Sequence, residues 1–133
     1  MGASASELPR PTIAELGILR ILWVLGPSTV RKVYEHSQGG NGTVGYTTIL
    51  KFLQIMHGKG LVVRDASQRA HVFSAQLSQD QTQRQMTSFL VDNVFDGSRS
   101  QLVLQALGGN SHASADELAE IRSLLERLEE EQS

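Results

Sequence analysis

A set of hydrogen-bond donors in the segment 46–59 falls on one side of a helix, if the segment is helical. Thr47, Lys51 and Gln54 are spaced i, i+4 and i+7, and Thr48 stands at the edge of the same face. Hydroxyl, ammonium and amide groups can all donate hydrogen bonds to base edges and phosphates. Because the segment contains no carboxylate to repel a polyanion, this face is a candidate for reading nucleic acid.

The other side of the same segment is apolar, at the i, i+3, i+4, i+7 spacing of a helix that packs on a core. This spacing predicts a helix that begins near Tyr46 and ends at Gly58 or Gly60. Polar residues opposite such a stripe are often only a solvated face, so the helix alone does not decide its function. The stripe consists of Ile49, Phe52, Leu53 and Met56.

Two short strands are predicted after this helix, Leu61–Arg64 and Ala70–Phe73, joined by a polar loop. They form a hairpin that carries Arg64, Arg69 and His71 near its tip. These side chains are placed to lie over phosphates, where charge counts and no sequence is read. For His71, a plain surface position is an equal alternative.

Two further helices are predicted ahead of this pair of elements. Thr12 and Glu15 have the spacing of a capping box, which starts a helix that runs to Leu25. A second, short helix begins near residue 30 and ends before a glycine-rich connection at 38–42. Three helices followed by a hairpin is the order of a winged helix, a helix-turn-helix variant whose third helix enters the major groove.

Three more helices are predicted after residue 77, over 78–95, 98–107 and 114–133, with Ser114 and Glu117 as a second capping box. Their apolar residues are too few to enclose a core, so they need another surface to cover them. A second copy of the chain is the favoured surface, and the winged domain of the same chain is the alternative. The residues expected at a dimer interface are Phe89, Leu90, Leu102, Val103, Leu118, Ile121 and Leu125.

The charge of the chain is divided along its length. Residues 1–78 hold eight Arg and Lys against four Asp and Glu, whereas residues 79–133 hold four against ten, which together give the net charge of −2. A basic first half suggests a polyanionic partner, and chance is the alternative. A length of 133 residues with 40% hydrophobic residues suits a small folded protein and excludes a large multidomain enzyme.

Several classes of site are not expected. The chain has no cysteine, no catalytic serine motif and no phosphate-binding loop. Its histidines are not spaced as metal ligands, so no metal, no cofactor and no enzymatic activity are predicted. The longest apolar run, Ile21–Leu25, is too short to cross a membrane, which favours a cytoplasmic protein. The histidines are His36, His57, His71 and His112.

Short motifs along residues 12–130 are similar, in order and spacing, to those of one family of bacterial transcription regulators. They are Ala14-Glu15-Leu16, Ile21-Leu22-Trp23, Gly26-Pro27-Ser28-Thr29-Val30, Tyr46-Thr47-Thr48-Ile49-Leu50-Lys51, Lys59-Gly60-Leu61-Val62, Arg69-Ala70-His71-Val72-Phe73, Gly97-Ser98 and Leu102-Val103-Leu104. On these residues the chain resembles the penicillinase-repressor family, the BlaI/MecI/CopY type.

The resemblance implies a homodimeric winged-helix repressor that binds a pseudo-palindromic operator near a promoter. It implies a flexible tail at 1–11, a winged-helix DNA-binding domain at 12–77 and a helical dimerisation domain at 78–133. A winged-helix module that binds a protein rather than specific DNA is the alternative. The expected DNA-binding residues are Tyr46, Thr47, Thr48, Lys51, Gln54, Arg64, Arg69 and His71.

The resemblance also implies a mode of release. In antibiotic-responsive members of the family, a membrane metallopeptidase receptor triggers cleavage in the helix that corresponds here to 98–107. The matching bond lies close to Gln105 and Ala106, where this chain has Gln-Ala in place of the Asn-Phe of the cleaved members. The copper-responsive members use a C-terminal cysteine cluster, which this chain does not have.

Overall fold

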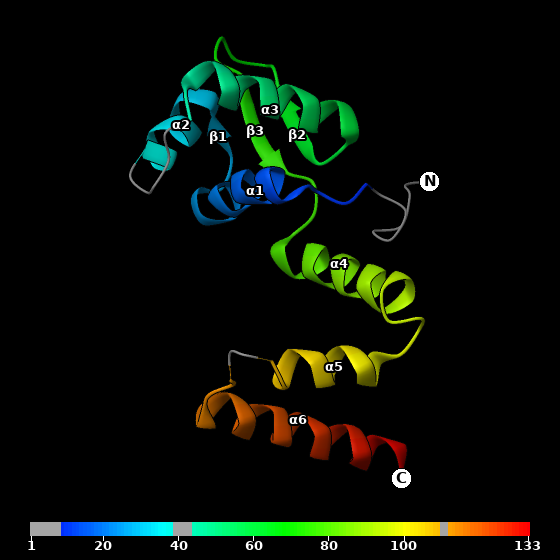
Figure 1. The fold of residues 1–133 in the computed structure, drawn as a ribbon. Coiled ribbons are helices and arrows are strands. Elements are labelled where there is room, and N and C mark those ends of the chain that lie inside the picture. Colours follow the sequence, from blue (N-terminus) through cyan, green and yellow to red (C-terminus); the bar gives the residue numbers. More distant parts are fainter. Residues whose placement is uncertain (1–8, 39–43, 110–111) are drawn as a thin grey trace. The chain divides into compact units, whose positions relative to one another are not determined.

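The structure is a computed structural model that describes residues 9–38, 44–109 and 112–133 (Figure 1). Most of the expected tail at 1–11 and of the expected glycine-rich connection at 38–42 therefore lies outside the described residues. The chain divides into two compact units, residues 1–89 and 90–133. The domain boundary expected near residue 78 stays a prediction.

The first unit has the element order of a winged helix. Its three helices lie around a three-stranded antiparallel sheet of order β1-β3-β2 (Figure 1). The loop at 66–71, between β2 and β3, is called the wing below. The elements are α1 (Ile13–Leu25), β1 (Ser28–Thr29), α2 (Val30–Gln38), α3 (Tyr46–Lys59), β2 (Val62–Asp65) and β3 (Val72–Ala75).

All three strands differ from the sequence-based expectation, β2 only by a shift of one residue, to Val62–Asp65. β3 begins at Val72, two residues after the expected start, so the wing is longer than predicted. β1 was not predicted, because a strand of two residues has no periodicity to detect. Thr29 also caps α2, since its Oγ1 accepts the backbone N–H of Lys32 at 3.2 Å.

The ends of α1 and α3 are set by local chemistry that the sequence reveals. Thr12 Oγ1 accepts the Glu15 N–H at 3.2 Å and the Thr12 N–H donates to Glu15 Oε1 at 2.8 Å, which confirms the capping box. Gly60 ends α3 in the left-handed conformation, with φ of 84°, where a side chain would be strained.

The core of the first unit lies between the helices and the sheet. The predicted stripe of α3 supplies its centre, where Leu53 and Met56 are fully buried. Trp23 Nε1 donates to the Leu77 carbonyl at 3.0 Å and so joins α1 to the segment after β3. The buried apolar residues of this core are Ile18, Leu19, Leu22, Val30, Val33, Ile49, Leu53, Met56, Leu61, Val62 and Phe73.

One ion pair connects α1 to the end of α3. Lys59 Nζ lies 3.1 and 2.9 Å from the two carboxylate oxygens of Glu15, which is only 2% exposed. Burial raises the pKa of Glu15, but hydrogen bonds from Thr12 and the Lys59 ammonium outweigh burial. The pKa of Glu15 is therefore held below its ordinary value of 4.5.

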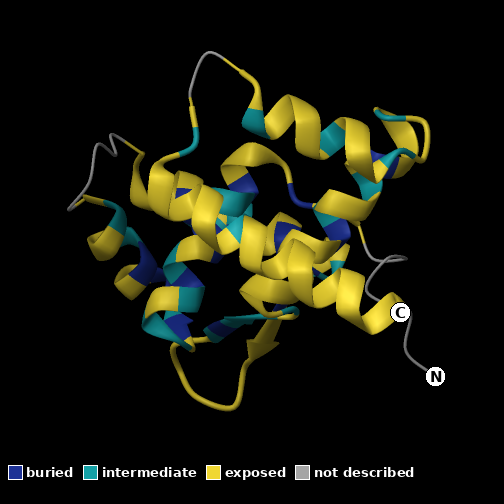
Figure 2. Cartoon of the chain, turned by 90° about the horizontal axis from the view of Figure 1, so that it is seen from below, coloured by how far each residue is buried: buried dark blue, intermediate teal, exposed yellow. Residues whose placement is uncertain are grey.

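The remaining helices are α4 (Gln79–Asn93), α5 (Arg99–Leu107) and α6 (Ala115–Gln132). The expected capping box of α6, Ser114 with Glu117, is confirmed, and the structure adds a cap at Ser98, whose side chain accepts the Gln101 N–H at the start of α5. Within their described ranges, α5 and α6 bury no residue. The helix that ends at the C-terminal label is exposed along almost its whole length (Figure 2).

The residues of α4 that the chain itself buries include polar ones. Leu90, which is expected at the dimer interface, is 41% exposed. Thr82, Gln85 and Val91 are buried instead. A count of apolar side chains could not find this face, because two of its three residues are polar.

We expect Lys59→Met to lower the free energy of unfolding by about 1–2 kcal/mol near neutral pH, because it leaves the buried Glu15 carboxylate without its cation. The partial exposure of Lys59, at 38%, keeps the loss small. Since the folded pKa of Glu15 is lowered, the pair stabilises above a pH of about 4.5, and its contribution is lost as the pH falls through the folded pKa.

Urea unfolding of the wild type and of Lys59→Met at about pH 7 and about pH 3.5 measures this difference. Lys51→Met is the matched control, because Lys51 is an exposed lysine on the same helix. We expect it to change stability by less than about 0.5 kcal/mol. Equal effects of the two substitutions at neutral pH would contradict a role for the ion pair.

Candidate nucleic-acid interface

A hollow of about 580 Å³ opens between the start of α2, the exposed side of α3 and the wing. It is called the wing hollow below. Its lining includes Phe73 from the core and Leu50 from α3 as apolar walls. Five of the expected DNA-binding residues line it together: Tyr46, Gln54, Arg64, Arg69 and His71.

The other three expected residues, Thr47, Thr48 and Lys51, are exposed on α3 outside the lining of the hollow. Their position follows from the helical period, because burying Ile49 and Leu53 turns the residues between them toward solvent. The structure therefore brings together two neighbouring sets of donors, one in the wing hollow and one on the open face of α3.

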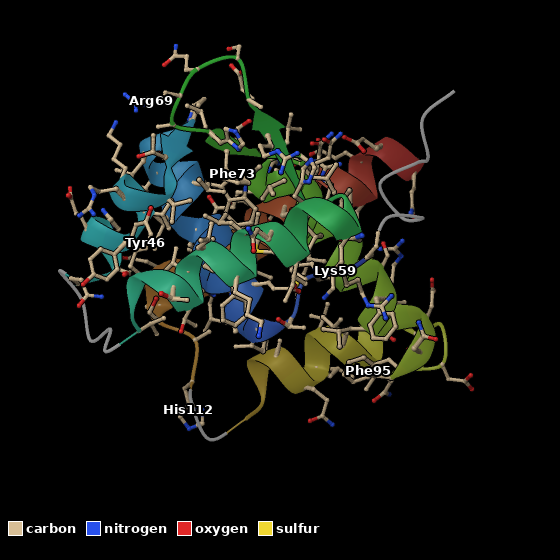
Figure 3. The ribbon with its side chains drawn as sticks, turned by 90° about the horizontal axis from the view of Figure 1, so that it is seen from above. Tyr46, Lys59, Arg69, Phe73, Phe95 and His112 are labelled. Carbon is tan, nitrogen blue, oxygen red and sulfur yellow. The ribbon has the colours of Figure 1, made fainter. Side chains whose placement is uncertain are left out.

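The side chains around the wing hollow come from separate elements. Arg64 lies in β2 opposite Phe73 in β3, and cross-strand partners share one face of a sheet. Arg69 lies in the wing itself, whereas Tyr46 and Lys59 stand at opposite ends of α3 (Figure 3). The site thus depends on how β2, β3 and α3 pack on one core.

The wing begins with a local turn. The Ser67 N–H donates to Asp65 Oδ1 at 2.9 Å. Hydrogen bonds from Ser67, the side-chain bond first and the backbone bond second, hold the pKa of Asp65 below its ordinary value. The single carboxylate at this end of β2 is therefore engaged in the turn and does not line the hollow.

Sequence reasoning missed Arg31, which also lines the wing hollow. Its Cζ lies 5.3 Å from the centroid of the Tyr46 ring. Tyr46 in turn contacts Tyr34 edge-on, with the ring centroids 5.7 Å apart and an interplanar angle of 74°. Val30 and Val33 are buried, so the helical period turns Arg31 to the outside of α2, and this spacing is the signal that the sequence offers.

The wing hollow is positively charged. Among the described residues that line it there are three arginines, Arg31, Arg64 and Arg69, and no aspartate or glutamate. Converging guanidinium groups with no competing carboxylate suit an anion with several oxygen acceptors. Three of the eight Arg and Lys in residues 1–78 thus line the hollow beside the donors of α3.

The described part of the chain holds neither a candidate metal site nor a candidate membrane span. No group of three or more His, Asp or Glu side chains is placed there to share a metal ion. No helix in those ranges is both long enough and apolar enough to cross a membrane.

The three helices, the small sheet and the wing define a winged-helix protein of the kind found in transcription regulators. The chain belongs to the penicillinase repressor family, whose sequence model matches residues 11–127. The resemblance found in the sequence motifs is thereby confirmed. The proteins of this family are regulators of transcription and not enzymes.

Solved structures with a similar fold include other regulators. The monomeric form of BlaI from Bacillus licheniformis, in complex with the blaP half-operator, is 19% identical, with a TM-score of 0.49 over 56% of this chain and 90% of that chain. A MarR family protein from Bacillus stearothermophilus is 17% identical, with a TM-score of 0.45 over 92% and 75%.

Transcriptional regulator Tm0710 from Thermotoga maritima is 16% identical, with a TM-score of 0.42 over 87% of this chain and 77% of that chain. No curated protein sequence matches the chain.

Proposed function

We propose that this protein represses transcription as a homodimer that binds a pseudo-palindromic operator in duplex DNA. The observation that carries the proposal is the acid-free face of α3 beside a hollow lined by three arginines. Membership of the penicillinase repressor family supports the same function. The BlaI structure with a half-operator is an example of DNA bound by a protein similar to this one.

In this proposal α3 is the recognition helix. The major groove is about 12 Å wide and admits a helix, and the first turns of a recognition helix contact the base edges. Thr47, Thr48 and Lys51 occupy those turns and are exposed. Gln54 follows one turn later, at the edge of the wing hollow. The wing lies beside the groove, with Arg69 on the phosphates.

The second copy is proposed to cover the apolar surfaces of the C-terminal helices. Leu118 and Leu125 of α6 are 42% and 52% exposed, and Val103 of α5 is 45% exposed. Burying such residues between two copies supplies the hydrophobic contact that each chain lacks. Of the expected interface residues, Phe89 differs, because the Arg10 guanidinium of the same chain lies 3.4 Å from its ring centroid.

Release by proteolysis is part of the same proposal, with a membrane metallopeptidase receptor as the partner. Gln105 and Ala106, where the family resemblance indicates the cut, are exposed in the last turn of α5. A cut between them separates α6 from the DNA-binding unit. Because this chain has Gln-Ala where cleaved members have Asn-Phe, the peptidase must accept a different bond.

Intact-mass measurement tests the release step. The chain is produced together with a membrane metallopeptidase of the class proposed as its partner, and its mass is compared with that of the chain produced alone. A fragment that ends at Gln105 supports the proposal. A chain that stays intact when the operator is released contradicts it.

Selection from a random duplex library, followed by titration at about 50 and about 200 mM salt, tests operator binding. We expect an inverted repeat that is still bound at the higher salt. Lys51→Ala should weaken binding about tenfold, because it removes a charge from the groove-facing side of α3. Thr47→Ala should relax base preference within each half-site.

Arg84→Ala is the matched control for Lys51→Ala, because it also removes one positive charge. Arg84 is an exposed cation on α4 that pairs with Asp80 at 2.8 Å, away from the wing hollow. It should leave operator affinity within about twofold. If no sequence is enriched and binding disappears at modest salt, the basic face serves an acidic protein partner instead.

Leu125→Glu tests the dimer. A charge in the apolar stripe of α6 should shift sedimentation from dimer to monomer at micromolar concentration, and should weaken binding to the inverted repeat more than to a single half-site. Ser123→Glu adds the same charge on the opposite side of α6 and should keep the dimer. A monomeric wild type, or dimers of both variants, would contradict this interface.

A further inference from the structure

We propose that Arg31, held in place by Tyr46, binds a phosphate of the DNA backbone in the wing hollow. The inference rests on the proposed function and adds to it a contact from α2. In this arrangement α2 and the wing both contact the phosphates of one DNA strand, while α3 contacts the base edges.

The position of Arg31 is fixed by a short chain of aromatic contacts. Tyr34 in α2 meets Tyr46 in α3 edge-on, and the guanidinium of Arg31 lies over the Tyr46 ring at 5.3 Å. Tyr46 is 39% exposed, so this contact stands at the rim of the hollow and is open to a ligand. The ring limits the conformations of a long side chain before any DNA arrives.

The contact with Tyr46 leaves the hydrogen-bond donors of Arg31 available. A guanidinium that lies over a ring interacts through its charge, while its N–H groups point outward in the plane of the group. Glu35, one turn further along α2, makes no ion pair with Arg31. The ion pairs found among the described residues join Lys59 to Glu15 and Arg84 to Asp80.

The partner that fits these donors is a phosphate diester on an extended strand. Arg64 and Arg69 reach the same hollow from β2 and the wing, whereas Arg31 reaches it from α2. A guanidinium can donate two hydrogen bonds to one phosphate, and a backbone that passes through the hollow presents successive phosphates to both sides. Leu50, which is partly exposed, forms an apolar wall that accepts a sugar face rather than a second charge.

Such a contact positions the protein and carries no sequence information. Arg31 should therefore affect operator and unrelated DNA alike, unlike Thr47 on the open face of α3. The next residue, Lys32, is a matched control for Arg31. It has the same charge in the same turn of α2 and is exposed, but it does not line the wing hollow.

The experiment compares Arg31→Ala with Lys32→Ala on two duplexes, the selected inverted repeat and a shuffled sequence of equal length, over a range of salt concentrations. Arg31→Ala should weaken both duplexes by a similar factor, about tenfold. The plot of log affinity against log salt should also become less steep. Its negative slope should shrink in magnitude by about 0.9 for each phosphate that the protein no longer neutralises. Lys32→Ala should leave the slope as in the wild type.

The role of Tyr46 is tested by measuring the effect of Arg31→Ala in two backgrounds. In Tyr46→Phe, which keeps the ring, Arg31→Ala should still weaken binding to the full extent. In Tyr46→Ala, which removes the ring, Arg31→Ala should weaken binding much less, since the two changes act on one contact. Urea unfolding of each variant shows whether the fold is kept.

The outcomes separate the two proposals. If Arg31→Ala keeps the wild-type affinity and slope while Lys51→Ala weakens binding, the phosphate contact is wrong and operator binding stands. If Arg31→Ala and Lys32→Ala lose affinity equally, the loss reflects the positive charge of α2 in general. The proposed contact between Arg31 and a phosphate is then also wrong. If the unaltered protein binds neither duplex, both proposals fail.

Discussion

The orientation of the candidate interface depends on the burial of one stripe of α3. Ile49, Leu53 and Met56 are almost inaccessible, and they fix the rotation of the helix about its own axis. Because a helix turns by about 100° per residue, this burial also determines that Thr47, Thr48 and Lys51 face solvent. Rotating α3 to bring other donors outward would expose a core residue at about 1.5–3 kcal/mol each. The reading face is therefore a consequence of hydrophobic packing.

The two ends of α3 are held by different interactions. At its C-terminal end, Lys59 pairs with the buried Glu15, so the helix is tied to the start of α1. At its N-terminal end, Tyr46 contacts Tyr34 and Arg31 at an exposed rim. Because Glu15 is buried, the ion pair at the C-terminal end contributes to stability, whereas at the N-terminal end the guanidinium of Arg31 from α2 is exposed to solvent. One helix thus joins the stable part of the core to the face proposed to contact DNA.

Features that depend on neighbours in sequence could be predicted, and those that depend on packing could not. The capping boxes at Thr12 and Ser114 and the apolar stripe of α3 need only a few adjacent residues, and each is present in the structure. The choice between Arg31 and Lys32 is different, because it depends on which side of α2 meets Tyr46 in another helix. The buried face of α4 was missed for a related reason. Its polar members, Thr82 and Gln85, are buried by tertiary contacts, and a periodic pattern of apolar residues in the sequence cannot predict the burial of polar ones.

Under the proposed function, the basic first half of the chain binds DNA and the apolar surface of its C-terminal helices joins two copies. A single DNA-binding unit contacts few phosphates, and its affinity falls steeply with salt. Joining two such units makes the second contact intramolecular, which can raise affinity by about 10²–10⁴ without a new kind of contact. The exposed leucines of α6, including Leu118 and Leu125, are the groups that can supply this joining, and the surrounding carboxylates keep the helix away from DNA. Loss of α6 would then abolish tight binding while every residue of the wing hollow stays in place, so repression can be controlled through dimerisation alone.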